Sequence, residues 1–122
     1  LEVSATAGPV VVRGDRDHLK QALLNIVMNG IEAMDGGGQL RVEVARSAGY
    51  AVARVIDHGP GIPPELKEKV FRLYFTTKER GSGIGLAMAS RAVQLHGGTL
   101  ELADTPGHGC TFILTLPAEA GL

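Results

Sequence analysis

The sequence predicts an α+β fold, a two-layer sandwich in which three helices lie on one face of a mixed, mostly antiparallel sheet. Two long segments carry apolar residues at helical spacing. Other segments alternate apolar and polar residues and come in consecutive pairs joined by short turns, which is the pattern of β-hairpins. Strands and helices do not alternate strictly along the chain, and this argues against a doubly wound parallel sheet.

The first long helix is predicted between Asp17 and Met34. Asp15 or Asp17 is expected near its N-terminus, where a carboxylate can accept hydrogen bonds from free backbone N–H groups. The glycine run at 36–38 ends the helix. The apolar residues that recur there at steps of three or four are Leu19, Leu23, Ile26, Val27, Ile31 and Met34.

Two further helices complete the helical layer. Pro64 suits the first turn of a short helix at 64–74, because proline lacks the N–H group that a first turn leaves unbonded. A polar, glycine-rich stretch follows, and the helical pattern returns at 84–96. The glycines at 97–98 end this last helix.

The strands are predicted as two hairpins and one short edge strand. Each hairpin turn contains glycine, and the second turn also contains proline. The predicted strands cover residues 10–12 at the edge, 40–45 with 50–57, and 99–103 with 110–117.

Composition limits the kind of function. The chain has 122 residues, 44% hydrophobic and 20% charged, which is ordinary for one globular domain, expected here to span 1–122. A net charge of -1 provides no basic surface for nucleic acid or for an anionic membrane. Cys110 is the single cysteine, and no apolar run is long enough to cross a bilayer. We expect a cytoplasmic, monomeric domain cut from a longer protein, which could itself be membrane-anchored.

Two asparagines on the first helix are candidates for metal binding. Asn25 and Asn29 lie one turn apart beside the apolar stripe, together with Glu32. Asparagine is a poor residue for a helix interior, so two of them at this spacing suggest a purpose. An amide oxygen is a neutral, hard ligand that suits one position of a Mg²⁺ shell. The alternative is a pair of solvated amides on an exposed flank.

Asp57 is a candidate for base recognition. It ends an apolar strand and precedes a turn-rich loop. A carboxylate there can accept a hydrogen bond from the exocyclic amine of adenine and would repel the carbonyl of guanine. Gly59 and Gly61 would let the backbone pass close to a ring. Alternatively, Asp57 caps a turn, which is a frequent use of aspartate before glycine and proline.

The glycines before the last helix are candidates for phosphate binding. Gly81, Gly83 and Gly85 precede the helix, so their N–H groups and the positive end of the helix dipole can face an anion. Lys78 and Arg80 stand just before them and could balance its charge. A flexible, solvent-exposed loop is the alternative.

The order of these segments resembles the catalytic ATP-binding domain of sensor histidine kinases, in the superfamily that also includes gyrase and MutL. The match runs from about Asp15 to Pro117. The matching segments are "DHLKQALLNIVMNGIEAM" for the asparagine box, "VIDHGPGIP" for the first glycine box, "VFRLYFTTK" for the phenylalanine box, "GSGIGLAMA" for the second glycine box and "HGGTLEL" to "GHGCTFILTLP" for the closing hairpin.

The resemblance implies a Bergerat-type fold that binds ATP and Mg²⁺. Asn25, Asn29 and Lys78 would be the catalytic residues, and Asn29 would be the metal ligand. Asp57 would bind the adenine amine. The nucleotide-binding set would be Asn25, Asn29, Asp57, Gly59, Gly61, Ile62, Lys78, Gly81, Gly83, Ile84, Gly85 and Leu86.

The resemblance also implies a reaction and its partners. The ATP-hydrolysing relatives carry a general-base glutamate where Asn25 stands, and asparagine cannot activate water as a base. The implied reaction is transfer of the γ-phosphate to a histidine on a separate phosphoacceptor domain of the same protein, and from there to a response regulator. The alternatives are a serine kinase of the anti-sigma-factor type and a nucleotide-binding module without transfer activity.

Two departures from the family pattern concern the proposed pocket. Gly30 replaces the usual alanine after Asn29 and should cost about 1 kcal/mol of helix stability. Cys110 stands where the family has threonine. A thiol is a weak hydrogen-bond donor, so a water-mediated contact to adenine that the threonine would make is in doubt.

Overall fold

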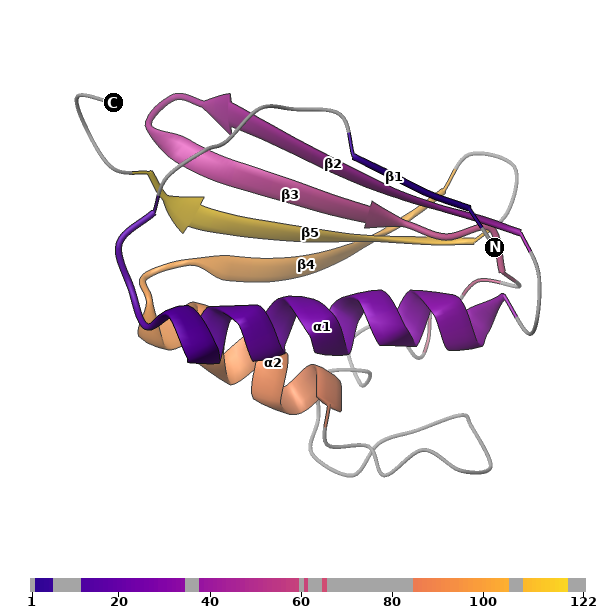
Figure 1. Cartoon of the computed structure of the whole chain (residues 1–122), viewed down its shortest axis with the longest axis horizontal. Helices are drawn as coiled ribbons and strands as arrows, with labels where there is room; N and C mark the ends of the chain where they lie inside the picture. Colours follow the sequence, from indigo (N-terminus) through magenta and orange to yellow (C-terminus); the bar gives the residue numbers. More distant parts are fainter. Residues whose placement is uncertain are drawn as a thin grey trace.

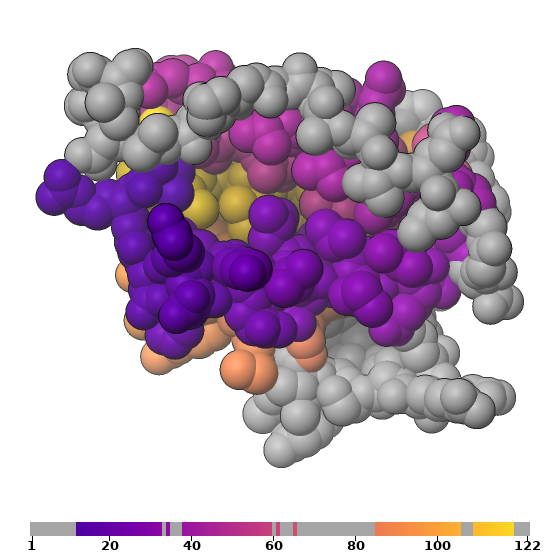
Figure 2. Space-filling view, in the orientation of Figure 1, coloured from indigo at the N-terminus to yellow at the C-terminus, as the bar shows by residue number. Residues whose placement is uncertain are grey.

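The protein is a two-layer sandwich of one sheet and two helices in a computed structural model that describes residues 2–5, 12–34, 38–59, 61, 65, 85–105 and 109–118. Helices α1 (Arg16–Ala33) and α2 (Gly85–Leu95) lie over the same face of the sheet (Figure 1). Figure 2 shows α1 running across the front of the molecule, with the orange atoms of α2 visible beneath it.

The sheet has five strands in the order β1-β2-β3-β5-β4. Among the described strands β1 and β2 pair in parallel, and the other neighbours pair antiparallel. The predicted mixed, mostly antiparallel sheet is therefore confirmed, as is the α+β class. The strands are β1 (Glu2–Ala5), β2 (Gln39–Ser47), β3 (Tyr50–Ile56), β4 (Thr99–Asp104) and β5 (Cys110–Pro117).

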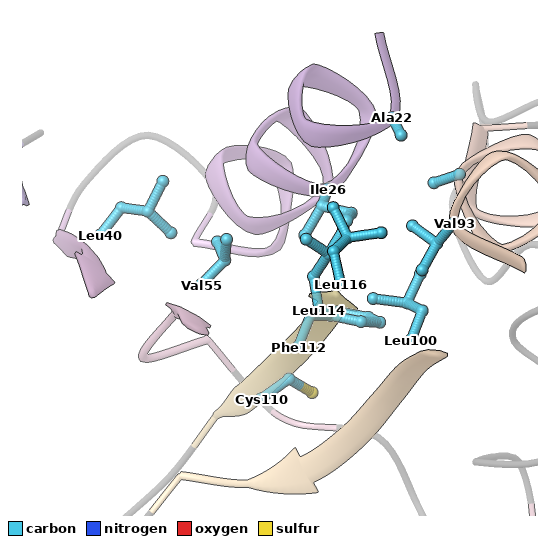
Figure 3. Packing of buried hydrophobic residues seen from close by; sticks show 11 residues of the cluster. Ala22, Ile26, Leu40, Val55, Val93, Leu100, Cys110, Phe112, Leu114 and Leu116 are labelled. Atoms are coloured by element: carbon cyan, nitrogen blue, oxygen red, sulfur yellow. The ribbon is translucent and has the colours of Figure 1, made fainter. Parts of the chain in front are cut away.

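The core lies between the helices and the sheet. In each strand alternate residues face the helices, because side chains along a strand point to opposite faces in turn. Ile26 from α1 and Val93 from α2 meet Phe112 of β5 there (Figure 3). The buried cluster consists of Ala22, Ile26, Leu40, Val55, Ala89, Val93, Leu100, Cys110, Phe112, Leu114 and Leu116.

The register brings the end of β3 to the start of β5. Ile56 is paired with Thr111, so the next residue, Asp57, lies opposite Cys110. The backbone N–H of Asp57 donates to the carbonyl oxygen of Cys110 over 2.9 Å. This pairing fixes Asp57 at the edge of the core, on the side of the sheet that the helices cover.

The edge of the sheet differs from the sequence prediction. The short edge strand expected at 10–12 lies mostly outside the described residues, and Val12 makes only an isolated antiparallel bridge to Ala118. At the edge beside β2 lies β1, which was not predicted and pairs in parallel with β2. Val12 cannot extend a strand for long because the chain enters the N-cap of α1 at Asp15.

The described helices number two, and the third predicted helix, at 64–74, lies outside the described residues except for Glu65. For the two long helices and the four hairpin strands, the predicted ends differ from the structure by no more than two residues. Neither described helix is both long and apolar enough to cross a membrane.

Candidate functional site

Asp57 is the one fully buried charged residue in the described part of the chain, with 1% of its surface exposed. Its Oδ1 atom accepts two backbone hydrogen bonds, from Gly59 N over 3.0 Å and from Cys110 N over 3.1 Å. Both bonds fall on Oδ1 and neither on Oδ2. A buried carboxylate needs such partners because desolvation of a charge is costly. The arrangement holds one oxygen firmly and leaves the other as the candidate ligand acceptor.

The bond to Gly59 closes a turn directly after β3. Turn capping was the alternative interpretation of Asp57 from the sequence, and the structure shows that Oδ1 makes this contact. The two interpretations are compatible because a carboxylate has two oxygens with separate acceptor sites. Gly61 follows with φ +82° and lies against the backbone of Gly109.

Thr105 and Gly109, which flank the connection between β4 and β5, pack closely against Asp57. A side chain at Gly109 would overlap the backbone oxygen of Asp57. Thr105, which is buried, donates its hydroxyl hydrogen bond to that same oxygen over 3.1 Å. Neither Gly109 nor Thr105 was among the site residues predicted from the sequence. The signal for Gly109 in the sequence was a second glycine, at 107, because a hairpin turn does not require two.

Asn25 connects the two helices. Its side-chain nitrogen donates to the backbone oxygen of Gly85 over 3.2 Å, and its side-chain oxygen accepts from Gln21 Nε2 over 3.2 Å. Asn25 is half-buried, so it is not a solvated amide on an exposed flank. This contact places the first turn of α2, the end of the predicted phosphate-binding glycines, beside the middle of α1.

Asn29 lies one helical turn after Asn25 and is also half-buried. The next residue, Gly30, faces the sheet. A Cβ atom at Gly30 would lie 3.8 Å from Asp57 Cβ and 2.7 Å from Leu40 Cδ1. One stretch of α1 therefore contacts α2 through Asn25 and approaches Asp57 through Gly30, with Asn29 between the two.

The structure describes seven of the predicted site residues. Leu86 is half-buried and packs against the core at the start of α2. Among all the described residues, no group of three or more His, Cys, Asp or Glu side chains is arranged to hold a metal ion. The described site residues are Asn25, Asn29, Asp57, Gly59, Gly61, Gly85 and Leu86; those outside the described residues are Ile62, Lys78, Gly81, Gly83 and Ile84.

Comparison with known proteins places the chain in a family. The sequence profile of the histidine kinase-, DNA gyrase B-, and HSP90-like ATPases matches residues 14–120. Sporulation kinase D of Bacillus subtilis (strain 168) is 35% identical over 115 residues, which cover 94% of this chain and 23% of that protein.

Solved structures agree with the family match. The mycobacterial sensor histidine kinase MprB superposes with a TM-score of 0.89 at 33% identity, over 97% of this chain and 82% of that one. Full-length ShkA in complex with AMPPNP superposes with a TM-score of 0.82 at 25% identity, over 96% of this chain and 25% of that one.

The chain belongs to the family of histidine kinase-, DNA gyrase B-, and HSP90-like ATPases. Two of these relatives have names that state an activity: sporulation kinase D is a kinase, and MprB is a sensor histidine kinase. The resemblance seen in the sequence is thereby confirmed. The chain spans 15% to 26% of the length of the curated relatives that it matches.

Proposed function

We propose that this chain is the ATP-binding catalytic domain of a two-component sensor histidine kinase, which transfers the γ-phosphate of ATP to a histidine on a separate dimerisation and phosphoacceptor domain. The buried carboxylate of Asp57 carries the proposal, because one of its oxygens is already held by two backbone N–H groups. Family membership supports the proposal, and AMPPNP in the ShkA structure supports an adenine nucleotide as the ligand.

Asp57 would select adenine through Oδ2. Oδ1 cannot turn away without loss of the bonds from Gly59 and Cys110, so the direction of Oδ2 is set by the backbone. The exocyclic amine of adenine donates to such an oxygen, whereas the carbonyl of guanine at that position has no proton to offer. Gly59, Gly61 and Ile62 would form the walls of the base pocket.

Asn29 would contribute one oxygen to Mg²⁺, and its chemistry fits this role because Mg²⁺ prefers oxygen ligands. One amide fills a single octahedral position, so phosphate oxygens and water would supply the rest. A bound Mg²⁺ neutralises negative charge on the phosphates. Lys78 would add a second positive charge there.

The α2 end of the site would hold the phosphates. Gly85 begins α2, where free backbone N–H groups and the helix dipole favour an anion. Asn25 fixes this end of α2 to α1 by its bond to the Gly85 oxygen. The segment formed by Gly81, Gly83 and Ile84 would lead into this end, and Leu86 would anchor it in the core.

The transfer step would use the acceptor histidine itself as the nucleophile. A neutral imidazole nitrogen would attack the γ-phosphorus, and the P–O bond to ADP would break with its electron pair going to ADP. The imidazole would then release its other N–H proton to water. Asn25 cannot take a proton from water, so hydrolysis is not assisted at that position. ATP would be held until the acceptor domain arrives, and a response regulator would receive the phosphoryl group afterwards.

Substitution of Asp57 by asparagine tests the nucleotide site. The asparagine side chain keeps an oxygen for Gly59 N and Cys110 N but presents an NH₂ group in place of Oδ2, so donor meets donor at the adenine amine. We expect calorimetric titration with ADP and with AMPPNP, in Mg²⁺, to show affinity reduced by about tenfold or more. Wild type should prefer ADP to GDP, and omission of Mg²⁺ should weaken AMPPNP binding.

A matched control separates this effect from a general change of charge. Glu101→Gln removes one carboxylate at an exposed position of β4 and should leave ADP affinity unchanged. Wild-type protein that binds no adenine nucleotide would refute the proposed site and favour a scaffold role. With a purified phosphoacceptor domain, acid-labile phosphate on its histidine is the expected product; acid-stable phosphate would instead indicate a serine kinase, and no transfer would indicate a binding module.

A further inference from the structure

Two buried threonines lie behind the backbone of Asp57. Thr105 directly follows β4 and Thr111 lies in β5, and their exposed fractions are 7% and 8%. The Thr105 hydroxyl donates to the backbone oxygen of Asp57 over 3.1 Å. The two threonine hydroxyl oxygens lie 3.0 Å apart. A chain of two hydroxyl groups therefore ends at the residue proposed to recognise the base.

The direction of the protons along this chain is fixed. A carbonyl oxygen only accepts, so Thr105 uses its single hydroxyl proton for Asp57. Thr111 must then be the donor in the contact between the two hydroxyl groups. Hydrogen bonds aligned in this way polarise one another, and more strongly in a buried environment than in water.

The same segment also holds the carboxylate of Asp57. Thr105 N donates to the Gly109 oxygen over 3.1 Å and closes the connection between β4 and β5. The next residue, Cys110, donates from its N–H group to Asp57 Oδ1. Thr105 and Cys110 thus fix Asp57 at two points, its backbone oxygen and Oδ1, and the direction of Oδ2 follows from them.

We infer that Thr105, supported by Thr111, is a positioning residue for base selection. This inference rests on the proposed function, in which Asp57 Oδ2 accepts the amine of an adenine nucleotide. Without the Thr105 hydroxyl, the backbone oxygen of Asp57 loses this donor and the end of β3 can rotate. Loss of the hydroxyl therefore reduces the binding free energy contributed by the adenine amine. The contribution of the phosphates stays unchanged.

The test compares two nucleotides that differ at this amine. Inosine diphosphate carries a carbonyl where ADP carries the amine. Thr105→Val replaces the hydroxyl by a methyl group of similar shape, and we expect the ratio of ADP to inosine diphosphate affinity to fall by about three- to tenfold. Thr105→Ser restores the donor and should restore the ratio. Titration calorimetry gives both affinities.

Two further variants keep the test decisive. Thr111→Val retains the bond from Thr105 to Asp57 but removes its supporting donor, so a smaller fall in the ratio is expected, and this variant carries the test if Thr105→Val does not fold. Thr99→Val changes an exposed threonine at the start of β4 and should alter neither affinity.

The outcomes distinguish this inference from the proposed function. Wild-type protein that does not prefer ADP to inosine diphosphate contradicts the proposed function itself. A selective wild type whose ratio is unchanged by loss of the hydroxyl groups overturns the role of Thr105 and leaves the proposed function standing. An equal loss of affinity for both nucleotides would show a structural role only and would also overturn it.

Discussion

At the scale of single residues, Gly109 and Asp57 are fitted to one another. Gly109 has φ +119°, and a Cβ atom there would overlap the backbone oxygen of Asp57 and lie 2.9 Å from His58 Cα. These are backbone atoms, so no rotamer change can relieve the contact. Retreat of either strand end would stretch the bond from Cys110 N to Asp57 Oδ1. The close approach at Gly109 is therefore part of the candidate site.

Gly109→Ala should damage both stability and binding. Its matched control is Gly49→Ala, at φ +84°, where a Cβ atom meets nothing within 4 Å. The control carries only the strain of a positive φ, about 1–2 kcal/mol, whereas the alanine at 109 adds a backbone clash and should cost about 3 kcal/mol or more. Urea unfolding measures both. Equal losses of unfolding free energy for the two variants would show that the backbone around Gly109 shifts without further cost and would contradict this prediction.

The sequence could identify Asp57 but not the groups that hold it. An aspartate at the end of an apolar strand, followed by glycines, is visible locally. Gly59 N, one of the two donors to Oδ1, is local and agrees with the turn interpretation. The other donor to Oδ1 and the donor to the backbone oxygen are about fifty residues away, at Cys110 and Thr105. Backbone N–H groups are present at almost every position, so a sequence does not show which one will be used.

At the scale of elements, α1 positions the candidate site, because it contacts α2 through Asn25 and approaches Asp57 through Gly30. The glycine lets the helix lie close to the sheet. Glycine costs helix propensity, which the sequence shows. The structure adds that Leu40 Cδ1 lies 2.7 Å from where a Cβ atom at Gly30 would stand. Leu40 is buried, so it cannot simply move into solvent. The glycine therefore makes room for a core side chain of β2.

The effect of Gly30→Ala should depend on residue 40. In the wild-type background, displacement of Leu40 should offset the gain of about 1 kcal/mol in helix propensity and leave the protein no more stable. In a Leu40→Val background the δ-methyl groups are absent, so the same substitution should stabilise by about 1 kcal/mol. A double-mutant cycle by urea unfolding checks this. Additive effects would contradict the contact.

The N-terminus of α1 should make a pH-dependent contribution to stability. Asp15 caps the helix, and its hydrogen bonds with the backbone of His18 and Asp17 lower its pKa below the ordinary 3.8. A lowered pKa in the folded state means that the contribution is complete above about pH 4 and is lost as the pH falls through the folded value. Asp15→Asn lacks this titration. The stability difference between wild type and variant should therefore shrink on acidification; a constant difference would contradict it.

The elements that the sequence predicted well are those with local signals. The ends of α1 and α2 are marked by Asp15 and by the glycines after residue 96, and each hairpin has its own turn. The pairing of β1 with β2 has no such signal, because a parallel pair is joined across a long connection and not by a turn. The sequence therefore did not predict β1 at this edge of the sheet.

At the scale of the whole molecule, α2 is joined to α1 near both ends of α2. Asn25 Nδ2 donates to the Gly85 oxygen at the end near the site. At the other end Asp15 N donates to His96 Nε2 over 2.9 Å, while His96 Nδ1 lies 2.7 Å from the Ala92 oxygen. Since Nε2 accepts, Nδ1 must carry the proton. The helix pair is thus fixed as one layer before any ligand binds.

The two links should separate stability from binding. His96→Ala removes the distant link and should lower stability by about 1–3 kcal/mol, with ADP affinity kept within about twofold because the Asn25 link remains. Asn25→Ala releases the first turn of α2 and should weaken ADP binding by about tenfold, with a smaller loss of stability. Urea unfolding and calorimetry measure these quantities, and Gln94→Ala, exposed on α2, is the control. If His96→Ala weakens ADP binding as much as Asn25→Ala does, the helices respond as a single body and the two links have no separate roles.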